Sequence, residues 1–189
     1  MNKAILPVMA TVLWASSGAT TIFDNFPQWD GNITDGWFGQ AQSMTTPAVD
    51  NILMEWRFEM AAGNTVGQVG GSVQTMAGNV PSGVVLWSDT AVVPGQGGVI
   101  IFNNIGLSLT SGQAYAFVVD FLGYSGETIH FSTNNSMQGD GIWFNGPWFN
   151  FGPDLDQKIY ARYEAVPEPA TLVGFGAGLL LLGIRKLRR

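Results

Sequence analysis

The sequence ILMEWRFEM at residues 52–60 decides the fold class of this chain. Its even positions, from Ile52 to Met60, are all apolar, and Glu55, Arg57 and Glu59 stand between them. Successive side chains of a β-strand point to opposite faces, so this alternation predicts a half-buried strand. Arg57 lies two residues from each glutamate on the polar face, whose charge is therefore predicted to be compensated within the strand.

The same character continues outward along residues 20–165. Further runs with strand character lie at 84–87, 99–102, 114–122, 128–132, 142–144 and 158–164. Turn clusters rich in Gly, Pro and Asn separate them, at 79–83, 94–98, 111–112, 125–126 and 139–141. This part of the chain lacks a helical period over eleven or more residues. Residues 20–165 are therefore predicted to form an all-β domain, a β-sandwich or jelly roll.

Composition limits the chemistry that the domain can perform. The 189 residues include no cysteine and one histidine, and 46% of them are hydrophobic. Disulfide frameworks, thiol nucleophiles and cysteine-type zinc sites are excluded. A domain of about 150 residues buries enough surface to fold without such staples.

The N-terminus has the three parts of a secretory signal. Lys3 supplies a positive start, residues 4–15 are apolar, and Ser17 and Ala19 form a small-residue site. We predict a signal peptide at residues 1–19 with cleavage after Ala19. The alternative is a buried first element of the domain, which Pro7 and the small residues fit poorly.

The C-terminus has the character of a membrane anchor. An uncharged apolar run begins at Ala170 and ends at Ile184, and the basic residues Arg185, Lys186, Arg188 and Arg189 follow it. As a helix the run rises about 22 Å, and basic side chains that snorkel can supply part of the remaining span. Basic residues after such a segment stay cytoplasmic, so the body is expected outside the inner membrane.

The exported body is strongly acidic. Residues 20–169 hold three basic residues and all 14 acidic ones, a net charge of −11. Such a body repels polyanions, so we predict that it has no nucleic-acid partner.

The junction between body and anchor reads Val166-Pro167-Glu168-Pro169. This trio, the apolar run and the basic tail together resemble the PEP-CTERM protein-sorting domain of Gram-negative, exopolysaccharide-producing bacteria, over residues 166–189. The resemblance implies that Pro167, Glu168 and Pro169 are recognised by an exosortase, a membrane protease-transpeptidase that removes the tail. It further implies export, transient anchoring in the inner membrane, and a role at the cell surface or in the extracellular matrix. The alternative is a permanent anchor with an ordinary proline-containing linker.

The body has a looser resemblance to β-sandwich domains of such exported proteins. It rests on residues 41–47, on the predicted hairpin 107–115 and on the pair Asp154 and Leu155. This resemblance implies architecture only.

Little in the body suggests catalysis. His130 is predicted to be a surface residue on the polar face of its strand, and no Gly-x-Ser-x-Gly elbow accompanies it. Glu55 and Glu59 lie about 13 Å apart along one strand, too far for paired glycosidase carboxylates. We therefore expect no catalytic residue and a non-enzymatic protein, with a glycan hydrolase as an alternative that other carboxylate pairs could support.

The segment 141–151 holds five aromatic residues separated by Asn and Gly. Trp143 and Trp148 could stack on sugar rings beside the amides of Asn145 and Asn150, which makes a carbohydrate-binding module the first alternative function. The other interpretation is two core-facing strands joined by a turn at 145–147.

No cofactor is expected, and two acidic groups are the candidates for binding calcium. The loop from Asp30 to Gly36 begins like an oxygen-ligand loop, but its glycine falls one position late and no glutamate follows at the required place. Asp140, Asp154 and Asp156 form the second group. Solvated turns are the expected role for both, and no metal site is predicted.

Overall fold

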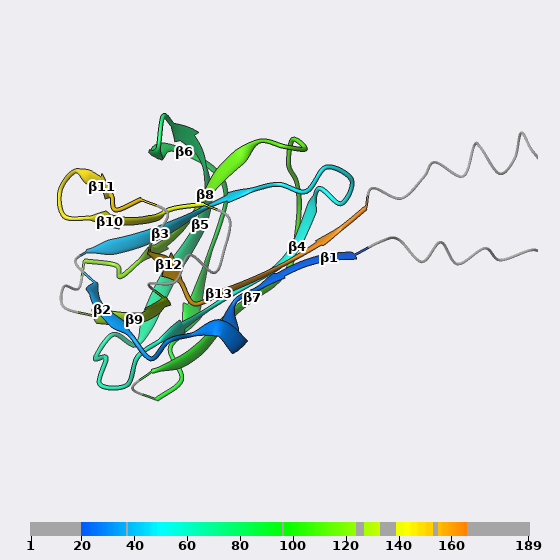
Figure 1. The fold of residues 1–189 in the computed structure, drawn as a ribbon. Coiled ribbons are helices and arrows are strands. Elements are labelled where there is room, and N and C mark those ends of the chain that lie inside the picture. The colour runs from blue at the N-terminus through cyan, green and yellow to red at the C-terminus, as the bar shows by residue number, and fades with distance from the viewer. Residues whose placement is uncertain are drawn as a thin grey trace, which may run out of the picture. The chain divides into compact units, whose positions relative to one another are not determined.

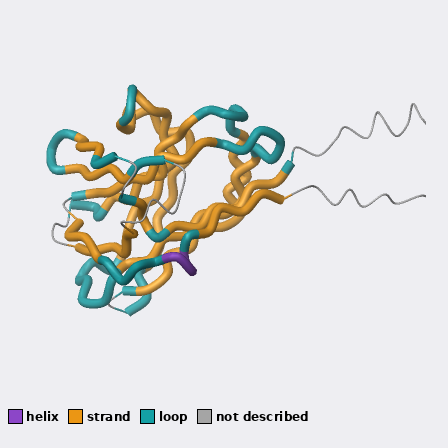
Figure 2. The backbone as a smooth tube through the Cα atoms, viewed as in Figure 1, coloured by secondary structure: helices purple, strands orange, loops and turns teal. Residues whose placement is uncertain are grey.

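The computed structural model describes residues 20–36, 38–95, 97–123, 127–132, 139–152 and 155–165. This part of the chain forms two antiparallel sheets (Figures 1 and 2). The predicted all-β architecture is thus confirmed. Within these ranges no helix is long and apolar enough to cross a membrane. The predicted signal at 1–19 and the predicted membrane helix from Ala170 to Ile184 lie outside the described residues.

The first sheet has seven strands, and β4 is its centre. β4 pairs with β13 on one side and with β7 on the other, and β1 pairs with the outer side of β13. β9 pairs with β2, β12 and the end of β4. Its strands are β1 Thr20–Asp24, β2 Ile33–Gly36, β4 Ile52–Met60, β7 Gly98–Ser108, β9 Glu127–Ser132, β12 Asp156–Gln157 and β13 Ile159–Glu164.

The second sheet has six strands in the order β11-β10-β3-β8-β5-β6. Its strands are β3 Gly39–Thr45, β5 Gln68–Ala77, β6 Val80–Val92, β8 Ala114–Asp120, β10 Gly141–Phe144 and β11 Trp148–Asn150. A short 3₁₀ turn, η1 Phe26–Gln28, follows β1.

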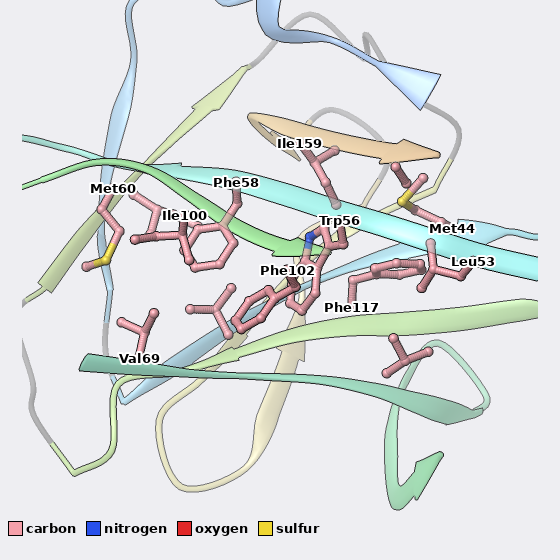
Figure 3. Packing of buried hydrophobic residues seen from close by; sticks show 14 of the residues in the cluster. Met44, Leu53, Trp56, Phe58, Met60, Val69, Ile100, Phe102, Phe117 and Ile159 are labelled. Atoms are coloured by element: carbon pink, nitrogen blue, oxygen red, sulfur yellow. The ribbon is translucent and has the colours of Figure 1, made fainter. Parts of the chain in front are cut away.

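The apolar core lies between the sheets (Figure 3). Trp56 of β4 stacks on Phe102 of β7 at 5.1 Å between ring centroids and meets Phe117 of β8 edge-on at 5.5 Å. Gly71 of β5 faces these rings, and a Cβ there would overlap Phe102. The core is therefore packed around a position that only glycine fits.

The alternation predicted for residues 52–60 holds only in part. Trp56, Phe58 and Met60 are buried as predicted, but Leu53 is fully buried and Met54 is not. Met54 has no register partner on either β7 or β13, because the pairings step from Leu53 to Glu55. This bulge inserts one residue, and the inward face therefore changes from even to odd positions.

Two predicted boundaries are wrong. The turn expected at 79–83 is shorter, because β6 already begins at Val80 and includes Pro81. Proline has no N–H to donate to a neighbouring strand, and β6 tolerates it because β6 is the edge strand of its sheet. The strand expected to reach Leu122 ends at Asp120, whose Oδ1 accepts a hydrogen bond from Leu122 N at 2.7 Å. Leu122 then adopts φ +54° and leaves the ladder.

A buried polar contact joins the two sheets. Gln42 of β3 donates from Nε2 to Asp156 Oδ1 at 2.9 Å and accepts at Oε1 from Gln157 N at 2.9 Å. Asp156 is fully buried. Residues 41–47 were expected to precede the first long strand. Residues 41–45 of this segment instead belong to a strand, β3.

Candidate functional site

The outer face of the second sheet carries a row of residues that crosses all six strands. Register places Trp148 opposite Phe144, Phe144 opposite Gly39, and Asp120 opposite both Gly39 and Gly70. Gly70 in turn lies opposite Thr90. Because directly opposed residues share a face, the row contains two aromatic rings at one end and a carboxylate between two glycines.

The next row explains why this face is hollow. Ala41 and Val118 are register partners and are buried on the outer side with Ala116 and Ile142. Asn150 of β11 donates to the Asn79 carbonyl at 2.8 Å, in the turn between β5 and β6. The two edges of the sheet therefore meet, and the face between them is concave.

Two adjoining hollows of about 370 and 420 Å³ occupy this face and share Ser72, Gln74 and Asp120. The first is also lined by Phe38, Phe144 and Trp148, and the second reaches β6 at Thr90. We call the two hollows together the outer groove. Phe144 and Trp148 lie 4.9 Å apart between centroids at an angle of 46°, and Phe38 is 42% exposed.

The four residues predicted to bind sugar are not brought together. Trp148 lies in the outer groove, but Trp143 is paired with Gln40 on the opposite face and is only 4% exposed. The prediction is therefore wrong for Trp143. Successive side chains of a strand point to opposite faces of the sheet, so Trp143 faces away from the groove that Phe144 lines.

The two asparagines have different positions. Asn150 shares the face of Trp148 but is held by Asn79 and by Asp140 Oδ2, to which it donates at 2.7 Å. Asn145 lies exposed in the turn between β10 and β11, which is the turn predicted at 145–147. The Asn150 side chain therefore links β11 to the turn between β5 and β6.

Sequence reasoning missed Phe38, Gln74 and Asp120. They come from separate segments, and only the register of β3, β8 and β5 reveals that they face one hollow. The two glycines opposite Asp120 were the available signal, because glycine in a strand marks a close approach or an open surface. A Cβ at Gly70 would lie 3.4 Å from Asp120 Cβ.

His130 is not the plain surface residue that was predicted. Its side chain is 14% exposed and stacks on Trp29 at 4.1 Å between centroids and 12° between planes. Its Nδ1 lies 3.2 Å from Glu59 Oε2, which also pairs with Lys158 Nζ. Lys158 in turn lies over the Trp29 ring, 4.4 Å from its centroid.

Glu59 is ionised more readily than an ordinary glutamate. Partial burial opposes the charge, but the hydrogen bond and charge of Lys158, together with His130, outweigh it and lower the pKa of Glu59. The second glutamate of the strand belongs to a different group, in which Glu55 pairs with Arg57 and Arg162. The predicted compensation by Arg57 is therefore found for Glu55, while Glu59 is compensated by Lys158.

The described residues include no group of three His, Cys, Asp or Glu placed to hold a metal ion. Asp30 accepts from Asn32 N at 3.2 Å in a local turn, and Asp156 is buried against Gln42. Asp154 lies outside the described residues. Asp140 accepts a hydrogen bond from Asn150, and Asp156 is fully buried and not in the solvated turn that was predicted.

The sorting residues Pro167, Glu168 and Pro169 and the predicted cleavage residue Ala19 lie outside the described residues. The sequence from residue 165 to 189 matches the PEP-CTERM protein-sorting motif family. The chain carries a PEP-CTERM sorting motif. This motif implies export and cell-surface sorting in bacteria, with processing by an exosortase.

Other comparisons concern the body. No curated protein sequence matches the chain. The clostridial cysteine protease Cwp84 after propeptide cleavage is similar in structure, with a TM-score of 0.56 and 14% identity over 78% of this chain and 40% of that one. The protease and lectin-like domains of Cwp84, a surface layer associated protein of Clostridium difficile, give 0.49 and 14% over 72% and 37%. At this identity the first likeness shows the fold alone.

Proposed function

We propose that this PEP-CTERM protein is a non-enzymatic, exported β-sandwich that is cleaved at its signal, processed by an exosortase at Pro167, Glu168 and Pro169, and active in the extracellular matrix or cell envelope of a Gram-negative bacterium. The single observation that carries the proposal is the sorting motif at residues 165–189. It begins directly after β13 ends at Glu164, so the folded body and the sorting segment are contiguous in the sequence.

The experiment is the intact mass of the mature protein from cells with and without the exosortase. The proposal expects loss of residues 1–19 and of the residues after the Pro-Glu-Pro trio. The variant Pro167→Ala/Pro169→Ala should keep its tail, while Val166→Ala, next to the trio, should be processed normally. If residues 170–189 remain attached to the fully exported protein, the sorting proposal fails.

A second candidate is retention in the matrix by binding polysaccharide. The outer groove supports it, because the groove sets aromatic rings beside hydroxyl, amide and carboxylate groups. This candidate is separate from processing, so either can fail alone.

A glycan hydrolase remains the third candidate. Its two carboxylates would be Asp89 and Asp120, which line the same hollow. Asp89 is opposite Gly71, whose face of β5 is turned to the core, while Asp120 is opposite Gly70 on the outer face. The pair therefore starts from opposite faces, which disfavours a shared substrate between them. Release of reducing ends by the native chain, abolished in Asp120→Asn, would establish this candidate instead.

A further inference from the structure

The floor of the outer groove is kept open by small side chains. Gly39 and Gly70 flank Asp120 on the two neighbouring strands, and Ala41 and Ser72 flank Val118 in the next row. The two hollows of the groove together are lined by residues from β11 and β10, across β3, β8 and β5, to β6.

The walls of the groove differ at its two ends. Phe38, Phe144 and Trp148 gather at the β10–β11 end, and the backbone fixes Phe38 there, because its N–H donates to the Phe144 carbonyl at 3.1 Å and its carbonyl accepts from Phe121 N at 3.3 Å. Ser72, Gln74 and Asp120 follow toward β6. Aromatic faces pack against the C–H faces of sugars, and the polar groups can bond their hydroxyls.

Charge selects among polysaccharides. None of the described residues that line the outer groove is a lysine or arginine, while Asp89 and Asp120 are among them. The body as a whole is also acidic. An acidic polymer would be repelled, whereas a neutral one would not be.

From these observations we infer that the outer groove binds a neutral polysaccharide chain laid across the strands, with Phe144 and Trp148 as the stacking platform and Gln74 and Asp120 as hydrogen-bonding partners. This inference rests on the proposed role in the matrix and gives it a ligand class. It builds the binding site from residues of β3, β8 and β5 as well as from the two platform residues of the β10–β11 hairpin.

The test is affinity electrophoresis of the full-length chain in mild detergent, in gels that contain xyloglucan, galactomannan or dextran, with alginate as the acidic probe. At least one neutral polymer should retard the protein, equally in low and high salt. Trp148→Ala should weaken that binding at least tenfold. Ser72→Phe, which fills the groove from β5, should do the same.

Phe149→Ala is the matched control. Phe149 is the next residue on β11, is 45% exposed, and lies opposite Trp143 on the other face of the sheet. Its removal should leave binding unchanged. If Trp148→Ala does not fold, Asp120→Asn and Ser72→Phe decide, with a several-fold loss expected for the former.

Four outcomes would overturn the inference: no retardation by any neutral probe, retardation by alginate alone, unchanged binding in both Ser72→Phe and Asp120→Asn, or equal loss in Phe149→Ala. None of them affects the mass measurement on the sorting motif, so failure of the groove and failure of the sorting proposal are distinguished.

Discussion

Thr20 and Glu164 lie directly opposite each other, as the first residue of β1 and the last residue of β13. The described body therefore begins and ends at neighbouring points of the first sheet. The segments that carry the predicted signal and the sorting motif are joined to the body at these two points.

A disulfide should form when Thr20 and Glu164 are both replaced by cysteine. Opposite residues of an antiparallel pair have Cα atoms about 4.5–5.5 Å apart, within disulfide reach. The chain has no other cysteine, so non-reducing electrophoresis and intact mass report the bond without ambiguity. The control Thr20→Cys/Ser108→Cys should stay reduced, because β13 and β4 lie between those positions. A bond in the control but not in the pair would contradict the register.

Glu59→Gln should lower the free energy of unfolding at neutral pH by about 1.5–3 kcal/mol, the usual worth of a hydrogen bond to a charged group. The substitution leaves Lys158 and His130 without their shared carboxylate. Urea denaturation measures the loss. Glu164→Gln, which removes a 41% exposed partner of Arg162, is the control and should cost about 0–1 kcal/mol.

The same variant has a pH signature. Because the pKa of Glu59 is lower in the folded protein than in the unfolded chain, its contribution is present above the unfolded pKa of about 4.3 and is lost as the pH falls through the folded pKa. The acid loss of stability should therefore be smaller in Glu59→Gln than in the native chain. An identical acid profile for the two proteins would count against the cluster.

Tyr163→Phe should stabilise the protein by about 1 kcal/mol. The Tyr163 hydroxyl is buried and has no hydrogen-bond partner among the described residues, so the substitution removes an unpaired polar group without changing the packing against Phe23. Burial raises the pKa of Tyr163, so its contribution is complete below the unfolded pKa of about 10 and is lost as the pH rises toward the folded value. Thermal melts from pH 8 to 11 should show less alkaline loss in Tyr163→Phe, while Tyr160→Phe on the outer face should behave like the native chain.

Gly71→Ala should destabilise the fold by about 1–3 kcal/mol or more. A Cβ at this position would overlap the Phe102 ring and approach Trp56 Cζ3 to 2.9 Å. Gly67→Ala is the control, since nothing lies within 4 Å of its Cβ position. Denaturation midpoints compare the two, and an equally small effect in both would show that the core is looser than described.

The sequence predicted those strands whose apolar residues alternate with polar ones, such as β13, where Ile159, Ala161 and Tyr163 are buried as expected. It did not predict β3 and β5. Gln40 and Gln42 are buried amides, and Gly70 and Gly71 look like turn residues, so local patterns there favour a loop. Partners on other strands make these segments β-strands.

The sequence indicated which segment contributes aromatic residues to the candidate site, but it did not indicate which residues of other strands join them. The aromatic segment 141–151 pointed to Trp148, which does line the outer groove. Pairing it with Trp143 required the two rings to share a face, and only the hairpin register, with Phe144 opposite Trp148, decides that. Asp120 has no local signal, since its exposure depends on glycines about 50 and 80 residues away.

The position of β13 also determines when the first sheet can be completed during synthesis. β13 lies between β1 and β4, although β1 is the first strand to leave the ribosome and β13 the last. In the described residues β1 pairs with β13 alone, so β1 has no neighbour until synthesis of the body is complete. A chain in this state lacks the strand that joins β1 to β4 in the first sheet. The first sheet can therefore be completed only after β13, the strand directly before the sorting motif, has been synthesised.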